Sequence, residues 1–366
     1  MRQHAGFQEV QATLMLTHGG SARISWRHSR RCVGKIMSAL LIKLRPTGPW
    51  RIGPDSGDRD RVDRIYHSDS LFSAVSGAMA RLGELDAWLD ATARATAEPA
   101  VSFSSCFPFY GETLYVVPPR NVWPPPASPK VRFKGARFVP LKVVESLIAG
   151  RAIAEDNWAI DGSSECLISG GAQGPFRVSV RSNAAVDRNG ESVAPHSTAC
   201  LEFTPGGGLW MIASFSGDAA KDRWGGPLKG ALRLLADSGF GGGRSRGWGR
   251  SEMPEFIEGD LPRLLLNPSE DANGYWLLSV FHPGASDAID WQHGNYSLST
   301  RGGRIESHGD EKKPTRMLTE GSVIVSAAAP VGAVSDVAPE NFAHPVYRSG
   351  FALAIPIPLA PSARPA

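Results

Sequence analysis

The amino-acid sequence predicts an α+β fold with short strands, long loops and few helices. Glycine and proline account for 40 and 28 of the 366 residues, nearly a fifth of the chain, against about 12% in average usage. Both residues interrupt helices, so this composition argues against a helical bundle. With 42% hydrophobic and 20% charged residues, the chain can bury a sizeable core and is neither disordered nor membrane-like. Its length suggests two or three domains.

The net charge of +3 is concentrated at the N-terminus. Residues 1–36 hold six basic side chains and one acidic one, which leaves 33 basic against 35 acidic residues in 37–366. The body of the protein is therefore not a basic coat for nucleic acid. Any contact with RNA or DNA must come from local patches.

Cysteine and histidine are scattered along the chain without metal-binding or redox spacing. The four cysteines, Cys32, Cys106, Cys166 and Cys200, form no CxxC pair, and no HExxH or HxH motif occurs. Neither a zinc ribbon nor a secreted disulfide framework is therefore indicated. No apolar run approaches the roughly 18 residues that span a bilayer. We expect a cytoplasmic protein with no structural metal and no cofactor.

The N-terminal extension, residues 1–36, differs in character from the rest of the chain. Its short apolar stretch, Ala12–Leu16, precedes a basic segment, Arg23–Arg31, which is the reverse of the order in a signal peptide. The pattern changes abruptly at Met37, and we expect this methionine to be the biological start. The alternative is a disordered basic arm that contacts RNA.

Two helices stand out in the first part of the chain. Residues 67–82 follow a strand-like segment at 38–45, and their apolar side chains recur at helical spacing. Ser68 or Asp69 is the expected N-cap, so the start of this helix should be exposed, with unpaired N–H groups. The second helix is expected at residues 227–237, where one apolar stripe faces a charged one.

Strands surround these helices, and a segment rich in proline, glycine and serine interrupts them at about residues 118–195. Further strands are expected at residues 101–105, 113–117, 176–181, 199–204, 209–214 and 253–257. The order β-α-β-β-(insertion)-β-β-α-β is an elaborated ferredoxin-like pattern. We therefore predict a first domain at residues 37–257. Residues 258–366 should form a second, strand-rich domain, with strands at 275–281, 296–299, 322–327 and 350–357.

A glycine-rich loop, residues 239–249, follows the second helix. It holds six glycines, two arginines, one serine and one tryptophan. Glycines permit positive φ and bring backbone N–H groups close to a ligand, while arginine and serine donate hydrogen bonds to phosphate oxygens. Trp248 offers a stacking face or a core anchor. The loop thus predicts phosphate binding, and the alternative is a helix C-terminus capped by glycine.

Other phosphate-binding loops do not fit residues 239–249. A Walker loop needs Gly-Lys-Ser/Thr, which is missing, and no set of glycines here has the GxGxxG spacing. Those loops also run from strand to helix, whereas this one runs from helix to strand. A dinucleotide-binding or P-loop enzyme is therefore not indicated.

Three motifs together resemble the repeat-associated mysterious proteins (RAMPs) of CRISPR systems. They are His67–Ala74 (HSDSLFSA), the glycine-rich loop and His344–Gly350 (HPVYRSG). The first and third favour one kind of member, the Csm-complex subunit of type III-A effectors that caps the 5′ handle of the guide RNA. The resemblance covers roughly residues 38–358. It implies two ferredoxin-like, RRM-related domains side by side, with the glycine-rich loop after the last helix of the first.

The resemblance also implies partners and a binding site. Such a subunit is non-catalytic, grips the repeat-derived 5′ handle of the guide RNA (crRNA), docks the large polymerase-like subunit and contacts a backbone RAMP subunit. Loop N–H groups and side chains would hold phosphates while bases splay onto flat side chains. The residues so implicated are Gly241, Gly242, Gly243, Arg244, Ser245, Arg246, Trp248, His67, Ser68, Arg181 and Arg188. For Arg181 and Arg188, solvated turn charges are an equal alternative.

The main alternative is an endoribonuclease of the same superfamily that processes guide RNA. His67 would then act as general acid/base in the attack of a 2′-OH on the adjacent phosphodiester. Such cleavage usually needs a second acid/base group, and only Tyr66 is near in sequence. A polymerase-like enzyme would carry a Gly-Gly-Asp-Asp run, which does not occur. We therefore expect no catalytic residues.

Overall fold

The computed structural model describes residues 38–54, 57–94, 97–125, 131–186, 193–259, 261–266, 271–305 and 309–359. All of them belong to one compact unit, Val33–Ala366. The N-terminal extension and Met37 lie outside the described residues, so both interpretations of them remain predictions.

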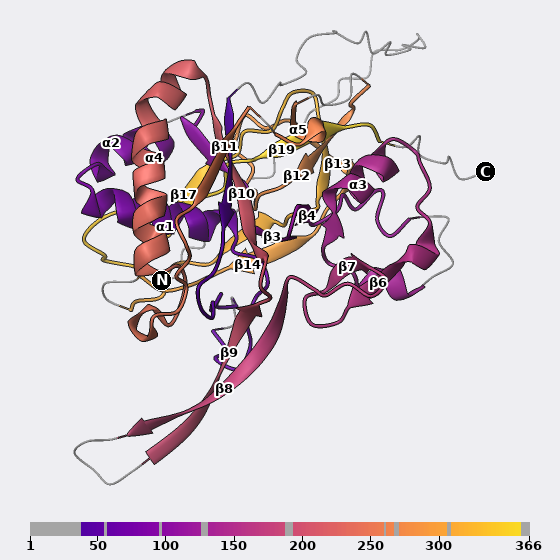
Figure 1. Cartoon of the computed structure of the whole chain (residues 1–366). Helices are drawn as coiled ribbons and strands as arrows, with labels where there is room; N and C mark the ends of the chain where they lie inside the picture. The colour runs from indigo at the N-terminus through magenta and orange to yellow at the C-terminus, as the bar shows by residue number, and fades with distance from the viewer. Residues whose placement is uncertain are drawn as a thin grey trace, which may run out of the picture. The chain divides into compact units, whose positions relative to one another are not determined.

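A seven-stranded sheet forms the centre of the first half of the chain (Figure 1). Its order is β11-β1-β10-β3-β4-β5, β2 also pairs with β10, and every pairing is antiparallel. The strands are β1 (Ala39–Leu44), β2 (Val101–Phe103), β3 (Phe107–Tyr110), β4 (Thr113–Val116), β5 (Val139–Pro140), β10 (Gly207–Phe215) and β11 (Glu255–Glu258). Helices combined with antiparallel sheets agree with the predicted α+β class.

Three helices gather on one side of this sheet. α1 (Ser68–Arg81) and α4 (Asp218–Ser238) lie side by side, and α2 (Leu85–Thr92) packs next to α1 (Figure 1). The apolar residues of α1 that recur at helical spacing, such as Leu71 and Met79, are buried. Their burial confirms the amphipathic helix predicted for this segment.

The start of α1 is buried, so the prediction of an exposed N-terminus is wrong. His67 is the N-cap residue and makes no capping bond through its side chain. The amide N–H of Ser68 donates to Oγ of Ser105 at 2.9 Å, and Oγ of Ser68 accepts the amide N–H of Val280 at 3.1 Å. Groups distant in the sequence thus replace the expected local cap.

α4 begins at Asp218 rather than at the predicted Pro227, which lies inside the helix. The prediction rests on the apolar stripe from Leu228 to Leu235, which begins just after this proline. Trp224, in the added turns, is buried and packs edge-on against Trp88 with ring centroids 5.4 Å apart. Tertiary packing of this aromatic pair outweighs the backbone hydrogen bond that proline removes.

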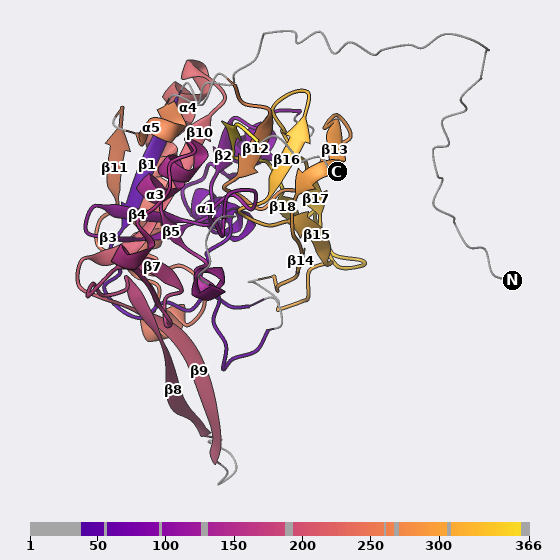
Figure 2. The same cartoon turned by 90° about the vertical axis from the view of Figure 1, so that its right-hand side faces the viewer.

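The predicted insertion forms a small subdomain followed by a long hairpin. The subdomain contains η1 (Val131–Gly135), α3 (Leu141–Ile148), η2 (Glu155–Asn157) and the paired strands β6 (Trp158–Asp161) and β7 (Cys166–Ser169). The hairpin pairs β8 (Phe176–Val186) with β9 (Val193–Phe203) and extends away from the central sheet (Figures 1 and 2). The strands predicted at 176–181 and 199–204 are parts of it.

The second half of the chain is strand-rich, as predicted. After the short α5 (Arg263–Leu266), an antiparallel sheet has the order β13-β16-β12-β19. Its strands are β12 (Gly274–Leu277), β13 (Ile289–Asn295), β16 (Val323–Ser326) and β19 (Ala354–Ile357). The pair β14 (Leu298–Arg301) and β15 (Thr315–Leu318) and the pair β17 (Val334–Asp336) and β18 (Tyr347–Ser349) lie between them in the sequence. Residues 271–305 and 309–359 contain no helix, so the helices expected of a second ferredoxin-like domain are not found in those segments.

One hydrophobic core runs through both halves. It contains Ile42 and Trp210 of the large sheet, Leu71 of α1, and Trp276 and Ile355 of the second sheet. This continuity holds the second half against α1, and two pockets lie at that junction. Among the described residues, no helix is long and apolar enough to cross a membrane.

Candidate functional site

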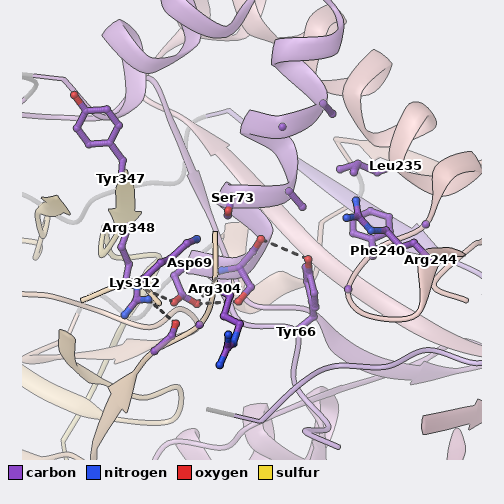
Figure 3. A pocket seen from close by; sticks show the side chains of 18 of the residues that line it. Tyr66, Asp69, Ser73, Leu235, Phe240, Arg244, Arg304, Lys312, Tyr347 and Arg348 are labelled. Atoms are coloured by element: carbon purple, nitrogen blue, oxygen red, sulfur yellow. Dashed lines mark hydrogen bonds and ion pairs between the residues drawn. The ribbon is translucent and has the colours of Figure 1, made fainter. Parts of the chain in front are cut away.

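A pocket of about 290 Å³ lies where α1, the glycine-rich loop and the second half of the chain meet (Figure 3). We call it the first pocket. Arg244 lies on the side of Leu235 and Phe240, and Lys312 and Arg348 lie on the opposite side. Among the described residues, the charged side chains that line it are the cations Arg81, Arg244, Arg304, Lys312 and Arg348 and one carboxylate, Asp69. This excess of positive charge in a concave site favours an anionic ligand.

The glycines of the loop allow its backbone to pack against the rest of the chain. Gly241 has φ of 67°, and a Cβ there would lie 2.4 Å from the carbonyl oxygen of Arg51. At Gly249, with φ of 80°, a Cβ would lie 2.0 Å from the carbonyl oxygen of Phe240. No side chain fits at either position. These two glycines therefore serve the close approach of backbone to backbone within the protein.

Many N–H groups of the loop are used within the protein. Those of Gly242 and Gly249 donate to the carbonyls of Arg51 and Pro49, and that of Phe240 donates to Gly249. The N–H groups of Arg246, Gly247 and Trp248 donate to carbonyls of the loop itself. Side chains are therefore better placed than these amides to meet a ligand. In the short helix η3 (Arg244–Arg246), Ser245 and Arg246 are exposed and Arg244 is half-buried.

The loop is tied to the long hairpin through Trp248. The guanidinium groups of Arg181, on β8, and Arg246 each lie 5.9 Å from the centre of the Trp248 ring. A nitrogen of Arg246 also donates to Oδ1 of Asn183 at 3.2 Å. Trp248 is buried and so acts as an anchor rather than an open stacking face. Trp248 thus contacts one cation of the loop and one from the middle of the hairpin.

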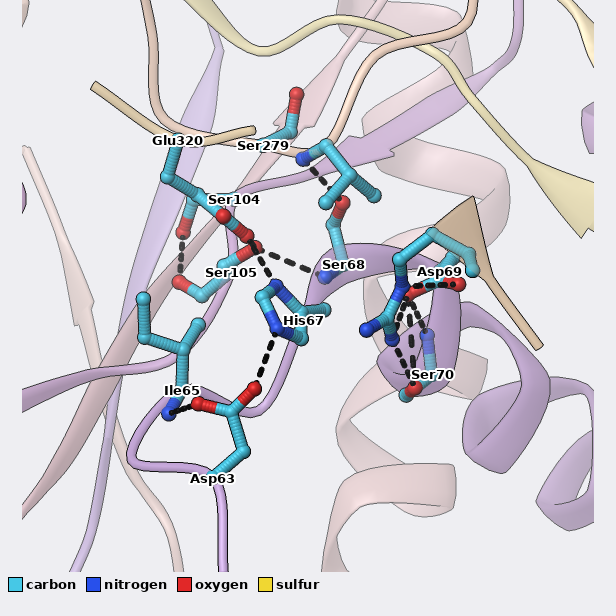
Figure 4. A network of polar contacts seen from close by, with 12 residues as sticks. Asp63, Ile65, His67, Ser68, Asp69, Ser70, Ser104, Ser105, Ser279 and Glu320 are labelled. Atoms are coloured by element: carbon cyan, nitrogen blue, oxygen red, sulfur yellow. Dashed lines mark hydrogen bonds and ion pairs between the residues drawn. The ribbon is translucent and has the colours of Figure 1, made fainter. Parts of the chain in front are cut away.

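His67 forms the centre of a buried ion network at the start of α1 (Figure 4). Its Nδ1 lies 2.7 Å from Oε1 of Glu320, and its Nε2 lies 3.0 Å from Oδ2 of Asp63. Burial alone would lower the pKa of His67, but the charge of Glu320 and the bonds to both carboxylates raise it to about 9. The imidazole is therefore protonated near neutral pH and donates to both carboxylates. Oγ of Ser105 also donates to Glu320.

Asp69 forms a second buried ion cluster, two residues further along α1. Arg301 donates to both carboxylate oxygens at 3.0 and 3.2 Å, and Nε of Arg348 lies 3.7 Å from Oδ2. Burial would raise the pKa of Asp69, but the charge and hydrogen bonds of Arg301 lower it. Arg348 also donates to the carbonyls of Arg301 and Gly302. Arg348 belongs to the HPVYRSG motif and Asp69 to the HSDSLFSA motif, so the structure joins the two motifs through an ion pair.

The predicted RNA-contacting residues fall into separate groups in the structure. The loop residues and Arg181 form one surface, while His67 and Ser68 are buried and bonded within the protein. Arg188 lies outside the described residues. The sequence did not indicate Glu320 and Arg301, whose partners His67 and Asp69 are 253 and 232 residues away in the sequence. Arg348 could have been predicted as a site residue from the sequence, because it lies in the recognised motif HPVYRSG.

The geometry of His67 argues against its use as a general acid/base. Both ring nitrogens are bonded to carboxylates, so neither has a free proton-transfer position. Because its pKa is raised, the imidazole is protonated near neutral pH and cannot accept a proton as a base. The side chain holds the start of α1 against Glu320 of the second half. Its role in the structure is that of a buried cross-link.

Comparison with solved structures shows which fold the chain shares. It is similar to a chain of the crystal structure of a Csm3–Csm4 subcomplex in the type III-A CRISPR-Cas interference complex, with 18% sequence identity, a TM-score of 0.61, and 87% of this chain and 99% of that chain covered. It is also similar to a chain of a Csm1–Csm4 cassette in complex with pppApA, with 17% identity, a TM-score of 0.56, and 88% and 99% covered. At such identities the likeness concerns the fold.

The family comparison is more specific. Residues 270–357 match the family model of the CRISPR Csm4 C-terminal domain. The resemblance to a RAMP-type Csm subunit that the sequence motifs indicated is thereby confirmed. No protein of curated function matches the chain.

Proposed function

We propose that this chain is the Csm4-type subunit of a type III-A CRISPR effector and that it holds the 5′ handle of the guide RNA. The family match at residues 270–357 carries the first part of this proposal. In the similar structures, Csm4 is combined with Csm1 and with Csm3. We infer that this chain likewise docks a large polymerase-like subunit and a backbone RAMP subunit.

The first pocket supports the RNA-binding part. Its rim is basic on both sides, with Arg244 from the glycine-rich loop and Arg304 and Lys312 from the second half. An RNA backbone in this groove would be contacted by both halves of the chain, and phosphate contacts supply most of the affinity of a protein for RNA backbone. Arg246 extends this basic surface toward the hairpin, where Arg181 is paired with Glu202 at 2.7 Å. The RNA strand would thus run from the first pocket past the glycine-rich loop.

The strand orders support two ferredoxin-like domains. In the first, β1, β3, β10 and β11 lie in the order β11-β1-β10-β3, with α1 and α4 in the connections. Numbered along the chain, this order is 4-1-3-2. The second sheet, β13-β16-β12-β19, is the same order read backwards. We infer a complete ferredoxin-like domain followed by a degenerate copy in which hairpins or loops replace the helices.

We further propose that the subunit is not an enzyme. Phosphodiester cleavage needs metal-bound carboxylates or a paired acid and base at the scissile group. The buried bonding of His67 removes the side chain that the endoribonuclease alternative requires. Purified protein should leave labelled repeat RNA intact with or without divalent metal. Site-specific cleavage that is lost in His67→Ala would overturn this part.

The test of handle binding is the double variant Arg244→Ala with Arg246→Ala. We expect weaker binding of handle RNA by about 1–3 kcal/mol for each charged hydrogen bond lost. The dependence of affinity on salt should also flatten, because fewer counterions are released. Fluorescence anisotropy with labelled repeat-derived RNA at several salt concentrations measures both effects.

The matched control is Lys142→Ala with Arg151→Ala. These cations are exposed, on or just after α3, and line neither the first pocket nor the other pocket at the junction of the two halves. The control should bind RNA as the parent does. If the loop variant folds and binds equally well, the glycines only cap α4 and the RNA-binding proposal fails. Assembly is tested separately by co-expression with Csm1, Csm3 and guide RNA, followed by co-purification.

A further inference from the structure

A second pocket, of about 390 Å³, lies on the His67 side of the start of α1. Its floor is the ion network of Asp63, His67 and Glu320. Its walls come from residues 117–124, which follow β4, and from residues 134–137 at the end of η1. Ser299 of β14 and Thr319 complete the lining. Both halves of the chain therefore contribute to this pocket, as they do to the first.

The rim of the second pocket carries exposed positive charge. Arg120 and Lys134 are exposed, and among the described residues neither side chain has an ion-pair partner. Arg137 is shared between Oδ1 of Asp63, at 3.2 Å, and the ring of Phe138, 5.8 Å from its centre. The rim thus offers two cations to a ligand.

The carboxylates in the floor do not cancel these cations. Asp63 and Glu320 both accept a hydrogen bond from the protonated ring of His67. Asp63 also accepts the amide N–H groups of Arg64 and Ile65, and Glu320 accepts Oγ of Ser105. Their negative charge is satisfied inside the protein. An anion at Arg120 and Lys134 therefore meets little repulsion from below.

The remaining wall is apolar and rigid. Val117, Pro118, Trp123 and Pro124 line it. Trp123 is fixed, because its indole N–H donates to the carbonyl of Ala136 at 3.2 Å and its ring packs on Phe133. A wall of prolines and an indole suits a flat, weakly polar group. The volume of the pocket also lies in the range of about 300–1,000 Å³ that is usual for small-molecule sites.

We propose that the second pocket binds one nucleotide of single-stranded RNA. The phosphate lies at Arg120 and Lys134, and the base lies over the exposed Pro124, beside the buried Pro118 and Trp123. This assignment rests on the proposed function, since the nucleotide belongs to the guide RNA held by the first pocket. It adds a separate contact on the other side of His67. The combination of exposed cations with an apolar wall distinguishes a nucleotide from inorganic phosphate, which needs no such wall.

The experiment uses the full chain and 4-thiouridine placed at each position of a labelled repeat-derived RNA. Irradiation should cross-link one position to the peptide containing residues 117–124. The variant Arg120→Ala with Lys134→Ala should lose this cross-link and bind the RNA about tenfold more weakly. Cross-links to residues 239–249 should persist. The charge-preserving exchange Arg120→Lys with Lys134→Arg should restore both signals, which separates a charge effect from misfolding.

The outcomes separate this inference from the proposed function. One outcome is that the Arg244/Arg246 variant loses RNA binding, the Arg120/Lys134 variant binds with normal affinity, and the parent forms no cross-link at the second pocket. This outcome overturns the second site and leaves handle binding intact. Unchanged binding in both variants means that handle binding itself is wrong. If free mononucleotide suppresses the cross-link without displacing the RNA, the second pocket binds a nucleotide and the proposal is supported. Normal RNA binding with lost association with Csm1 would instead assign the cations to an acidic protein partner and overturn the proposal.

Discussion

The first and second pockets lie on either side of the segment Asp63–Ser70, and their buried charges are arranged in opposite ways. Beneath the first pocket a carboxylate, Asp69, is held by two arginines of the second half. Beneath the second a cation, His67, is held by two carboxylates. In both places the buried ions pair with one another across the junction of the two halves. The buried ions therefore join the two halves, whereas the cations proposed to contact the ligand lie at the rims of the pockets.

The largest expected effect comes from breaking the cluster beneath the first pocket. Asp69→Asn keeps the size of the side chain but removes the buried carboxylate that Arg301 and Arg348 contact. Removing one partner of a buried ion pair typically costs about 3–5 kcal/mol. We therefore expect a loss of that order in the free energy of unfolding, measured with urea.

The control for this variant is Asp86→Asn, which removes an exposed carboxylate that pairs with Arg94. Exposed pairs contribute little, so its unfolding curve should stay close to that of the parent. Equal stability of the Asp69 and Asp86 variants would mean that the buried cluster does not join the halves. The His67 network would then be the one buried ion network of the two that joins the halves.

The His67 network gives the next largest effect, as a dependence of stability on pH. The pKa of His67 is raised from 6.5 to about 9, so its stabilising effect is complete below pH 6.5 and disappears as the pH rises through about 9. Such a shift corresponds to at most about 3–4 kcal/mol. The pKa values of Asp63 and Glu320 are lowered, so their contribution is complete above their ordinary values and is lost only in acid.

The measurement compares the parent with His67→Gln at pH 6 and pH 9.5. The free energy of unfolding of the parent should fall more over this interval than that of the variant, whose side chain does not titrate. Groups that do not interact with His67 titrate equally in both proteins and cancel in the difference. Parallel curves for the two proteins would show that His67 is not charged in the folded state.

The sequence predicted the local features of this molecule better than the distant ones. The apolar periodicity of α1 and the strands beside it are encoded in neighbouring residues, so they could be found. The start of α4 could not, because the packing of Trp224 on Trp88 overrides the preference of Pro227 for a helix start. Propensity is a weak guide where tertiary packing decides.

In the candidate site, too, the residues of a local motif could be predicted and the contacts between distant residues could not. Arg244, Ser245 and Arg246 were recognised from one short loop, and the structure places them at or beside the first pocket. His67 and Ser68 were expected at an exposed helix start, whereas the structure buries them against Glu320, Ser105 and Val280. Nothing in the residues around Glu320 indicates that partner. A motif can therefore be recognised correctly while the role of its residues is not.

The smallest expected effect tests whether the far rim of the first pocket binds RNA at all. Arg304 pairs with Glu311 at 2.7 Å, and both side chains are mostly exposed, at 68% and 76%. Arg304→Ala should therefore leave the unfolding curve nearly unchanged. Its affinity for handle RNA should fall by about two- to fivefold at low salt, and the difference should shrink as salt rises, because one phosphate contact is lost.

Glu311→Ala is the matched control, since it breaks the same ion pair and frees the cation, so its affinity should stay the same or increase. Equal weakening in both variants would mean that the ion pair shapes the loop around it, and that RNA contacts in the first pocket come from the glycine-rich loop side alone.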